Sequence, residues 1–350
     1  MDSQHFYYPN EQGARQRPLK PGNYANKQGA RRRPLKPGRH DWLYLRIRTE
    51  HIGVYPSPPM SGFAASADMG VAEAYVATRR DPNTTPNPVT YLLQGTLEDF
   101  LRFSCSENAQ WLLTIAHDLC DPAARRGSLW IMNDQYQTME YVQPTSPLRA
   151  AIYEYRVVES TTTVVLRITK RVPSHIRSFS RSIGYGRAMR NSILGRDGST
   201  CWITQTDGPV NNSHICPLRV GDAQARYIYQ IFNNMADPPA TIYSPQFGIL
   251  LNSSINHWFD QHFIGFRWIG NNQYQIHNFY NPEVTMPYGN GQWPRDREME
   301  PPFINGWVIT PPNPTSPDNP PPGLFRWHYL QCVLKRFRAA GYDRIAHIAM

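Results

Sequence analysis

The chain has 350 residues and a formal net charge of +9, from 36 Lys and Arg against 27 Asp and Glu. This length predicts two domains or one large one and is enough to bury a real core, and a 12% aromatic content indicates that the middle of the chain is not disordered. Five cysteines without a Cys-x-x-Cys pair argue against a disulfide framework and an ordinary zinc ribbon. A polar N-terminus and the lack of any run of ~18–20 apolar residues predict an intracellular protein, nuclear or cytoplasmic, that is neither secreted nor membrane-spanning.

Residues 1–40 are predicted to form a disordered basic tail. They hold nine Lys and Arg against two acidic residues, so the remaining chain is close to neutral. The segment Gln12–Gly22 recurs as Gln28–Gly38, and its Gly, Pro and like charges favour an extended chain. Such a tail fits an arm on nucleic acid or a nuclear import signal. A solvated tail from a chance duplication is the commoner explanation of basic runs.

Residues 41–170 are predicted to form an α+β domain whose role the sequence does not indicate. Leu43, Leu45 and Ile47 alternate with polar residues, which is typical of a half-buried strand. Apolar spacing predicts helix over 97–119, and short β-branched or aromatic runs predict strands at 128–132, 151–158 and 161–169. This region contains no phosphate-binding loop, no carboxylates paired at helical spacing and no nucleophile elbow.

Residues 171–198 are predicted to be a basic linker with a helix over 182–194. Residues 171–200 carry six arginines and one aspartate. Arg187, Arg190 and Arg196 are candidate nucleic-acid contacts, because guanidinium groups bind phosphate oxygens in pairs. A merely solvated helix explains the same residues equally well.

Residues 199–300 contain the residues arranged for chemistry. Two short apolar runs, Cys201–Thr204 and Ser213–Leu218, flank a turn signal at Asp207-Gly208-Pro209 and predict a hairpin with His214 near its end. A third apolar run at 248–251 precedes a helix that begins near Ser253 or Ser254. On that helix Asn256 and Asp260 are one turn apart and share a face.

The order strand, turn, strand with histidine, and helix with polar groups is that of a ββα metal-dependent nuclease unit. A histidine suits the base that takes a proton from water, because its ordinary pKa is close to neutrality. A divalent cation held by the helix would stabilise charge on the phosphate and the leaving group.

These residues resemble the HNH endonuclease family, in the version common in fungal proteins. The family pattern Cys-x-x-Thr-Gly, Ala-His-Ile-x-Pro, Asn-Gly-Leu-Leu-Leu and His-x-x-Phe-Asp is followed in order and spacing. The matching residues are Cys201, Thr204, His214, Ile215, Pro217, Gly248, Ile249, Leu250, Leu251, Phe259 and Asp260. The C-terminal segment 326–334 also resembles the tail that follows this domain in such proteins.

The resemblance implies a DNA endonuclease with His214 as general base. It implies one cation, Mg²⁺ or another divalent ion such as Mn²⁺ or Zn²⁺, on Asn256 with help from Asp260 or His257. It assigns structural roles to four further residues, namely Cys201, Thr204, Pro217 and Gly248.

Three positions depart from the family pattern: Gln205 replaces glycine, Phe247 replaces asparagine and Asn256 replaces histidine. An asparagine ligand brings no charge to the cation. The alternative is therefore a catalytically degenerate HNH fold that binds nucleic acid or protein, and a structural interaction protein with an addressing tail is a third hypothesis.

The rest of the chain is predicted to complete an α+β fold around the HNH-like domain. Alternating segments at 262–268 and 273–279 predict a hairpin around Gly270-Asn271-Asn272. Nine prolines in 301–323 predict an extended linker, and an amphipathic helix over 324–340, within a C-terminal segment 324–350, is expected to pack on the core. The sequence does not indicate the oligomeric state.

Overall fold

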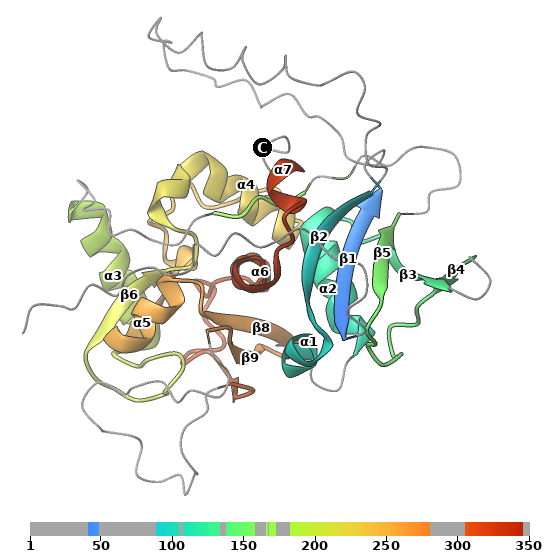
Figure 1. The fold of residues 1–350 in the computed structure, drawn as a ribbon. Helices are drawn as coiled ribbons and strands as arrows, with labels where there is room; N and C mark the ends of the chain where they lie inside the picture. Colours follow the sequence, from blue (N-terminus) through green and yellow to red (C-terminus); the bar gives the residue numbers. More distant parts are fainter. Residues whose placement is uncertain are drawn as a thin grey trace, which may run out of the picture. The chain divides into compact units, whose positions relative to one another are not determined.

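The computed structural model describes residues 41–48, 89–104, 108–133, 138–157, 166, 168–172, 183–280 and 305–345. Helices and strands are mixed in this part of the chain, which confirms the expected α+β class (Figure 1). The predictions for the tail 1–40 and for most of the strand at 161–169 lie outside the described residues. None of the described helices is long and apolar enough to cross a membrane.

A five-stranded sheet forms the first half of the fold. Its strands are β1 (Trp42–Arg48), β2 (Val89–Thr96), β3 (Ser128–Asn133), β4 (Thr138–Tyr141) and β5 (Ile152–Arg156). Their order is β2-β1-β5-β3-β4, with only β1 and β5 parallel. The helices α1 (Leu97–Ser104) and α2 (Ala109–Cys120) follow β2, and α1 contacts both β1 and β2. Alternation buries Leu43, Leu45 and Ile47 completely, as the sequence predicts.

The second half begins with α3 (Ile183–Asp197). It contains an antiparallel pair of strands, β6 (Val210–His214) and β7 (Gly248–Asn252). Between these strands lie α4 (Gly221–Asn233) and the 3₁₀ turns Leu218–Val220 and Pro245–Phe247. The helix α5 (Ser253–Asp260) follows β7 directly. Two strands and a helix are therefore present, but the histidine strand comes first and α4 lies between the strands, whereas the sequence predicted the histidine strand second.

The predicted strand Cys201–Thr204 is wrong, because these residues form a turn. The backbone N–H of Gln205 donates to the carbonyl of Cys201 at 2.9 Å, and Gln205 has a positive φ of 55°. The Trp202 indole donates to Asp197 at 2.8 Å and thereby holds the turn against α3. The strand that pairs with β6 is β7, which lies more than thirty residues further along the chain.

A three-stranded sheet, in the order β10-β9-β8, follows α5. Its strands are β8 (Ile264–Gly270), β9 (Gln273–Asn278) and β10 (Val308–Ile309). Asn271 and Asn272, both at positive φ, form the two-residue turn between β8 and β9, which confirms the predicted hairpin. The predicted linker 301–323 is corrected in its described part, because β10 pairs with β9 there.

The helix α6 (Pro322–Phe337) is the central element, and α7 (Tyr342–Ile345) follows it. It contacts α2 and β2 of the first half and α4 and β8 of the second half (Figure 1). The Tyr329 hydroxyl accepts from the Trp111 indole at 3.0 Å and lies 2.5 Å from Nδ1 of His277. One side chain of α6 therefore joins α2 to β9, and the predicted packing of this helix on the core is confirmed.

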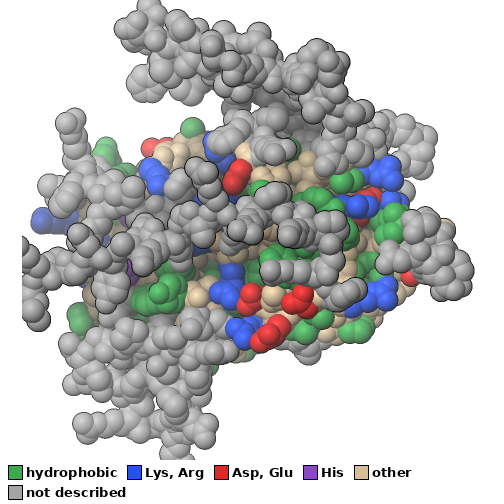
Figure 2. Space-filling model, viewed as in Figure 1, with side chains coloured by type: hydrophobic (Ala, Val, Ile, Leu, Met, Phe, Trp, Pro, Cys, Tyr) green, Lys and Arg blue, Asp and Glu red, His purple; other side chains and the backbone are tan. Residues whose placement is uncertain are grey.

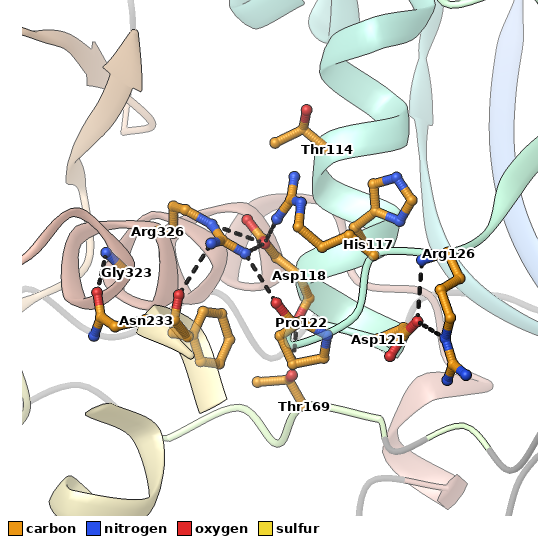
Figure 3. Close-up of polar contacts among 12 residues, drawn as sticks. Thr114, His117, Asp118, Asp121, Pro122, Arg126, Thr169, Asn233, Gly323 and Arg326 are labelled. Atoms are coloured by element: carbon orange, nitrogen blue, oxygen red, sulfur yellow. Dashed lines mark hydrogen bonds and ion pairs between the residues drawn. The ribbon is translucent and has the colours of Figure 1, made fainter. Parts of the chain in front are cut away.

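A buried carboxylate at the end of α2 ties three helices together (Figure 3). Asp118 is 1% exposed and accepts from Arg326 of α6 and from Arg125, the latter at 2.5 Å. Arg326 also donates to the carbonyls of Phe232 in α4 and Pro122. Because charged groups without partners are costly in the interior, each member of this cluster depends on the others.

We expect Asp118→Asn to lower the free energy of unfolding by about 3–5 kcal/mol, because it leaves two arginines without their shared counter-charge. Urea unfolding followed by circular dichroism measures this loss. The matched control is Glu98→Gln, which breaks an exposed pair with Arg102 and is expected to cost about 0.5 kcal/mol or less. Equal losses for the two variants would contradict the importance of the buried cluster.

Candidate active site between β6 and α5

The helix α5 presents one apolar and one polar face. Ile255 and Phe259 are buried, and Phe259 stacks on His328 of α6 with ring centres 3.9 Å apart. This packing fixes the rotation of the helix about its axis. Asn256 and Asp260, one turn apart, are thereby turned toward β6, which α5 contacts.

Ser213, Asn256 and Asp260 form a continuous hydrogen-bonded chain. The Ser213 hydroxyl donates to Oδ1 of Asn256, and Nδ2 of Asn256 donates to Oδ2 of Asp260 at 3.2 Å. Burial raises the pKa of the Asp260 carboxyl from 3.8 to about 7, and the hydrogen bond from Asn256 opposes this shift. The group therefore changes its charge near neutral pH.

His214 lies on the other side of the β6–β7 pair. It is paired with Gly248, and a Cβ built on Gly248 would lie 2.6 and 2.7 Å from side-chain atoms of Met189 and Ile193 in α3. The His214 and Tyr243 rings form an edge-to-face contact, with their centres 5.9 Å apart. Because neighbouring side chains of a strand point to opposite faces, Ser213 faces α5 whereas His214 faces the α3 side.

His257 and Phe247 lie outside the Ser213–Asn256–Asp260 chain. His257 is exposed, about 100° around the helix from Asn256. Phe247 is fully buried and packs on Tyr229 of α4 at 5.7 Å. The carbonyl of Phe247 accepts from the backbone of Ile215 at 2.9 Å, which extends the pairing beyond β6.

The four residues expected to have structural roles lie around the strand pair. Cys201 is 1% exposed, and its sulfur accepts from the backbone N–H of Asn252 at 3.3 Å. The Thr204 hydroxyl lies 2.7 Å from that of Thr206, and Pro217 is buried at the start of the first 3₁₀ turn. Gly248 allows the close approach of α3 described above.

The three candidate arginines of α3 occupy different environments. Arg187 is exposed and Arg190 is half-buried, so both border solvent. Arg196 is buried and donates to Asp197 at 2.6 and 2.7 Å, as well as to three backbone carbonyls. The expected phosphate contact of Arg196 is therefore corrected, because its guanidinium is enclosed within the protein.

A comparison with known protein families matched part of the chain. Residues 201–267 match the family model described as HNH endonuclease, a segment that runs from the Trp202 turn to β8. The chain is thus similar to HNH endonucleases over 67 of its 350 residues. No curated protein and no solved structure matches the chain.

The Asn256–Asp260 pair fits a cation that prefers oxygen ligands. Adjacent ligands of an octahedral ion with bonds of 2.0–2.1 Å lie about 3 Å apart. The two side-chain atoms that face one another here are 3.2 Å apart. In the structure the amide nitrogen of Asn256 faces Asp260, and its oxygen accepts from Ser213. Turning the amide by half a turn would place its oxygen beside the carboxylate and its nitrogen beside the Ser213 hydroxyl.

The remaining donors favour Mg²⁺ or Mn²⁺ over Zn²⁺. The described residues contain no group of three His, Cys, Asp or Glu side chains able to hold a metal ion. A hydroxyl, an amide and one carboxylate are oxygen donors, and Mg²⁺ is commonly held by one or two carboxylates together with substrate phosphates.

Ser213 is the residue of this site that the sequence reasoning missed. The sequence reasoning paired the His214 strand with residues 201–204, and this pairing did not indicate toward which face of the strand Ser213 or His214 points. Only the pairing of β6 with β7, with α5 packed against one side, shows that the side chain before the histidine faces the helix.

The titration of Asp260 predicts a pH-dependent stability difference. Its folded pKa of about 7 lies above its ordinary value of 3.8, so the folded protein binds the proton more tightly than the unfolded chain. The wild type therefore loses stability as pH rises from about 4 to about 7. We expect Asp260→Asn, which cannot ionise, to be more stable relative to wild type at pH 8 than at pH 5.

Urea unfolding at the two pH values measures this difference. The control is Asp237→Asn, which removes an exposed carboxylate from the loop after α4. An Asp260→Asn difference from wild type that is the same at pH 5 and pH 8 would contradict the raised pKa.

Proposed function

We propose that the HNH segment is a metal-dependent endonuclease that hydrolyses phosphodiester bonds of DNA. The observation that carries this proposal is the Asn256–Asp260 pair on α5, which would offer two oxygens to a hard cation once the Asn256 amide is turned, within a segment that matches the HNH endonuclease model. The cation, when bound, would supply stabilisation of the charge that develops on the phosphate and the leaving oxygen.

The side chains of the chain have distinct tasks in this proposal. With the Asn256 amide turned, the Ser213 oxygen would accept from the amide nitrogen and keep Asn256 and Asp260 aligned on α5. Asp260 releases its proton near neutral pH and then presents a charged oxygen, since its pKa is about 7. His214, the last residue of β6, accepts a proton from the attacking water as general base.

We infer a path for the DNA from the positions of these groups. His214 and the helix α3 are on one side of the strand pair, whereas Asn256 and Asp260 are on the other. A phosphodiester would therefore lie across the end of β6, with its backbone reaching the exposed side of α3. Arg187 and Arg190 border solvent on that helix and would contact neighbouring phosphates.

A second candidate function is DNA binding without cleavage. It is favoured by the separation of His214 from Asn256 to opposite faces of β6 and by the hydrogen bond from Ser213 to Asn256. In this case the same arginines bind DNA, but no side chain that could act as general base reaches a water molecule next to the phosphate.

Nicking of supercoiled plasmid with Mg²⁺ or Mn²⁺ at pH 8 tests the endonuclease. We expect His214→Ala to lower the rate about 10²–10⁴-fold, because a positioned base contributes that much. His214→Ala should keep the rise in melting temperature that the cation produces, whereas Asp260→Asn should lose both the rise and the cleavage. Asp237→Asn, the exposed control, should resemble wild type in both measurements.

Each alternative has its own outcome in this experiment. Equal nicking by wild type and His214→Ala would remove His214 from the mechanism. A wild type that binds duplex DNA but leaves it intact with either cation would support the binding function. A cation-induced rise in melting temperature that Asp260→Asn retains would place the cation elsewhere.

The two kinds of arginine on α3 predict opposite phenotypes. We expect Arg187→Gln to weaken duplex DNA binding and to leave the free energy of unfolding unchanged. The slope of the logarithm of the binding constant against the logarithm of the salt concentration should become shallower by about 0.9, the contribution of one phosphate contact. Arg196→Gln should instead lower the free energy of unfolding, because it leaves the buried Asp197 without its only positively charged partner among the described residues. Titrations at several salt concentrations and urea unfolding separate the two effects.

A further inference from the structure

An exposed tyrosine on α3 continues a row of rings that begins at His214. Tyr185 stacks on Tyr243, with ring centres 5.8 Å apart and planes inclined by 29°. Tyr243 in turn makes the edge-to-face contact with the His214 ring. Tyr185 is 67% exposed, so its ring rests on Tyr243 while most of its surface is accessible to solvent.

The turn that carries Tyr243 is held firmly by α4. Asp222, in the first turn of that helix, accepts from the backbone N–H of Ile242 at 2.7 Å and from the Thr241 hydroxyl at 2.9 Å. The Thr241 hydroxyl accepts from the backbone N–H of Tyr243 at 3.3 Å, and Ile242 is 2% exposed. Tyr185 therefore rests on a fixed ring, and ordering the pair in advance reduces the entropy lost when a ligand binds.

The residues on either side of Tyr185 leave space for a ligand. Gly184 and Gly186 precede and follow it, and a Cβ built on either glycine would have no atom of the described residues within 4 Å. Packing within the described part of the chain therefore does not account for glycine at these two positions. Glycine also allows the backbone of a ligand to approach closely.

The exposed side of α3 is positively charged. Arg187 and Arg190 border solvent, and neither forms an ion pair with an acidic residue in the described part of the chain. The single acid of α3, Asp197, is bound to the buried Arg196. Figure 2 shows Lys or Arg side chains at the left edge of the molecule, where Figure 1 places α3. This charge is complementary to a phosphate backbone.

We propose that Tyr185 stacks on an unpaired base of the DNA substrate, beside the phosphate that His214 faces. Stacking on an aromatic side chain tolerates every base, and the arginines of the same helix would contact the phosphates on either side of that base. In a paired duplex each base is covered by its neighbours in the stack, so the ring selects DNA that contains an unpaired nucleotide.

This inference rests on the proposed endonuclease function and names its class of substrate. Tyr185 is a residue that positions the substrate, because its ring would touch the base rather than the reacting phosphate. The row from Tyr185 through Tyr243 to His214 would then link recognition of the unpaired base to the position of the general base.

Fluorescence of 2-aminopurine tests the proposal, because stacking on an aromatic ring quenches its emission. The probes are one sequence as a single strand, as a duplex in which the 2-aminopurine is unpaired, and as a fully paired duplex. Each is titrated with the full chain in EDTA, which prevents cleavage. We expect the wild type to bind the two unpaired probes about tenfold more tightly than the paired duplex and to quench them. Tyr185→Ala should lose both effects, and Tyr185→Phe, which keeps the ring, should retain them.

The matched control is Tyr141→Ala. It removes a 46% exposed tyrosine from β4 that likewise contacts one neighbouring ring, that of Trp130 at 5.8 Å. This variant should bind and quench like wild type, and circular dichroism checks that all variants are folded. Equal wild-type affinity for the three probes would overturn the proposal, and so would a preference for unpaired DNA that Tyr185→Ala retains.

Cleavage kinetics separate stacking from an indirect effect on His214. With Mg²⁺ or Mn²⁺ and the duplex that contains an unpaired base, Tyr185→Ala should raise KM about tenfold and leave kcat unchanged. The reason is that stacking stabilises the bound substrate and the transition state equally. A lower kcat at unchanged KM would show that Tyr185 acts by holding Tyr243 and His214, and stacking on a base would then be refuted.

Failure of this inference is distinguishable from failure of the endonuclease function. A wild type that prefers unpaired DNA through Tyr185 but cleaves no probe would refute the endonuclease and support the stacking. Cleavage by the wild type, with binding and KM unchanged in Tyr185→Ala, would refute the stacking alone. A wild-type dimer that Tyr185→Ala converts to a monomer in sedimentation would also refute it, because a second copy would then cover the ring.

Discussion

The fold of the HNH segment depends on the hydrogen bonds that the buried guanidinium of Arg196 donates. Its acceptors are the Asp197 carboxylate and the carbonyl oxygens of Pro245, Gly248 and Asp318. A charge this deeply buried is tolerated only when its donors are satisfied, so these segments are held at fixed positions around it. Through Gly248 the guanidinium fixes β7, and through β7 it fixes which side chain of β6 faces α5.

That strand register divides the chemistry of the site between two sides. The oxygen donors of Asn256 and Asp260 lie with α5, and the imidazole of His214 lies with α3. Neither side holds a complete catalytic set by itself. The same carboxyl that would hold a cation has a pKa of about 7, so protons and cations compete for it at neutral pH.

Elements whose apolar residues repeat regularly over many positions were predictable from the sequence. Elements that are determined by strands or side chains far away in the chain were not. The apolar spacing of α6 and the alternation of β8 and β9 appear in the sequence because they repeat over several turns or residue pairs. The run Cys201–Thr204 has the composition of a strand, yet its partner positions are taken by β7, which no local pattern reveals.

The site was predictable to a similar extent. Motif order predicted His214, Asn256 and Asp260 as candidates, and helical spacing alone placed the last two on one face. The burial of Arg196 could not be predicted, because most of its acceptors are backbone carbonyls from distant segments.

The position of α6 in the chain has a consequence for protein synthesis. This helix follows both halves in sequence, yet its buried side chains lie against α2, β2, α4 and β8. Until the ribosome has synthesised α6, both halves lack the helix against which their apolar side chains pack. Domains ordinarily begin to fold as they emerge, from the N-terminus onward. Here the final assembly must wait for α6, and until then the nascent chain exposes apolar surface that chaperones would recognise.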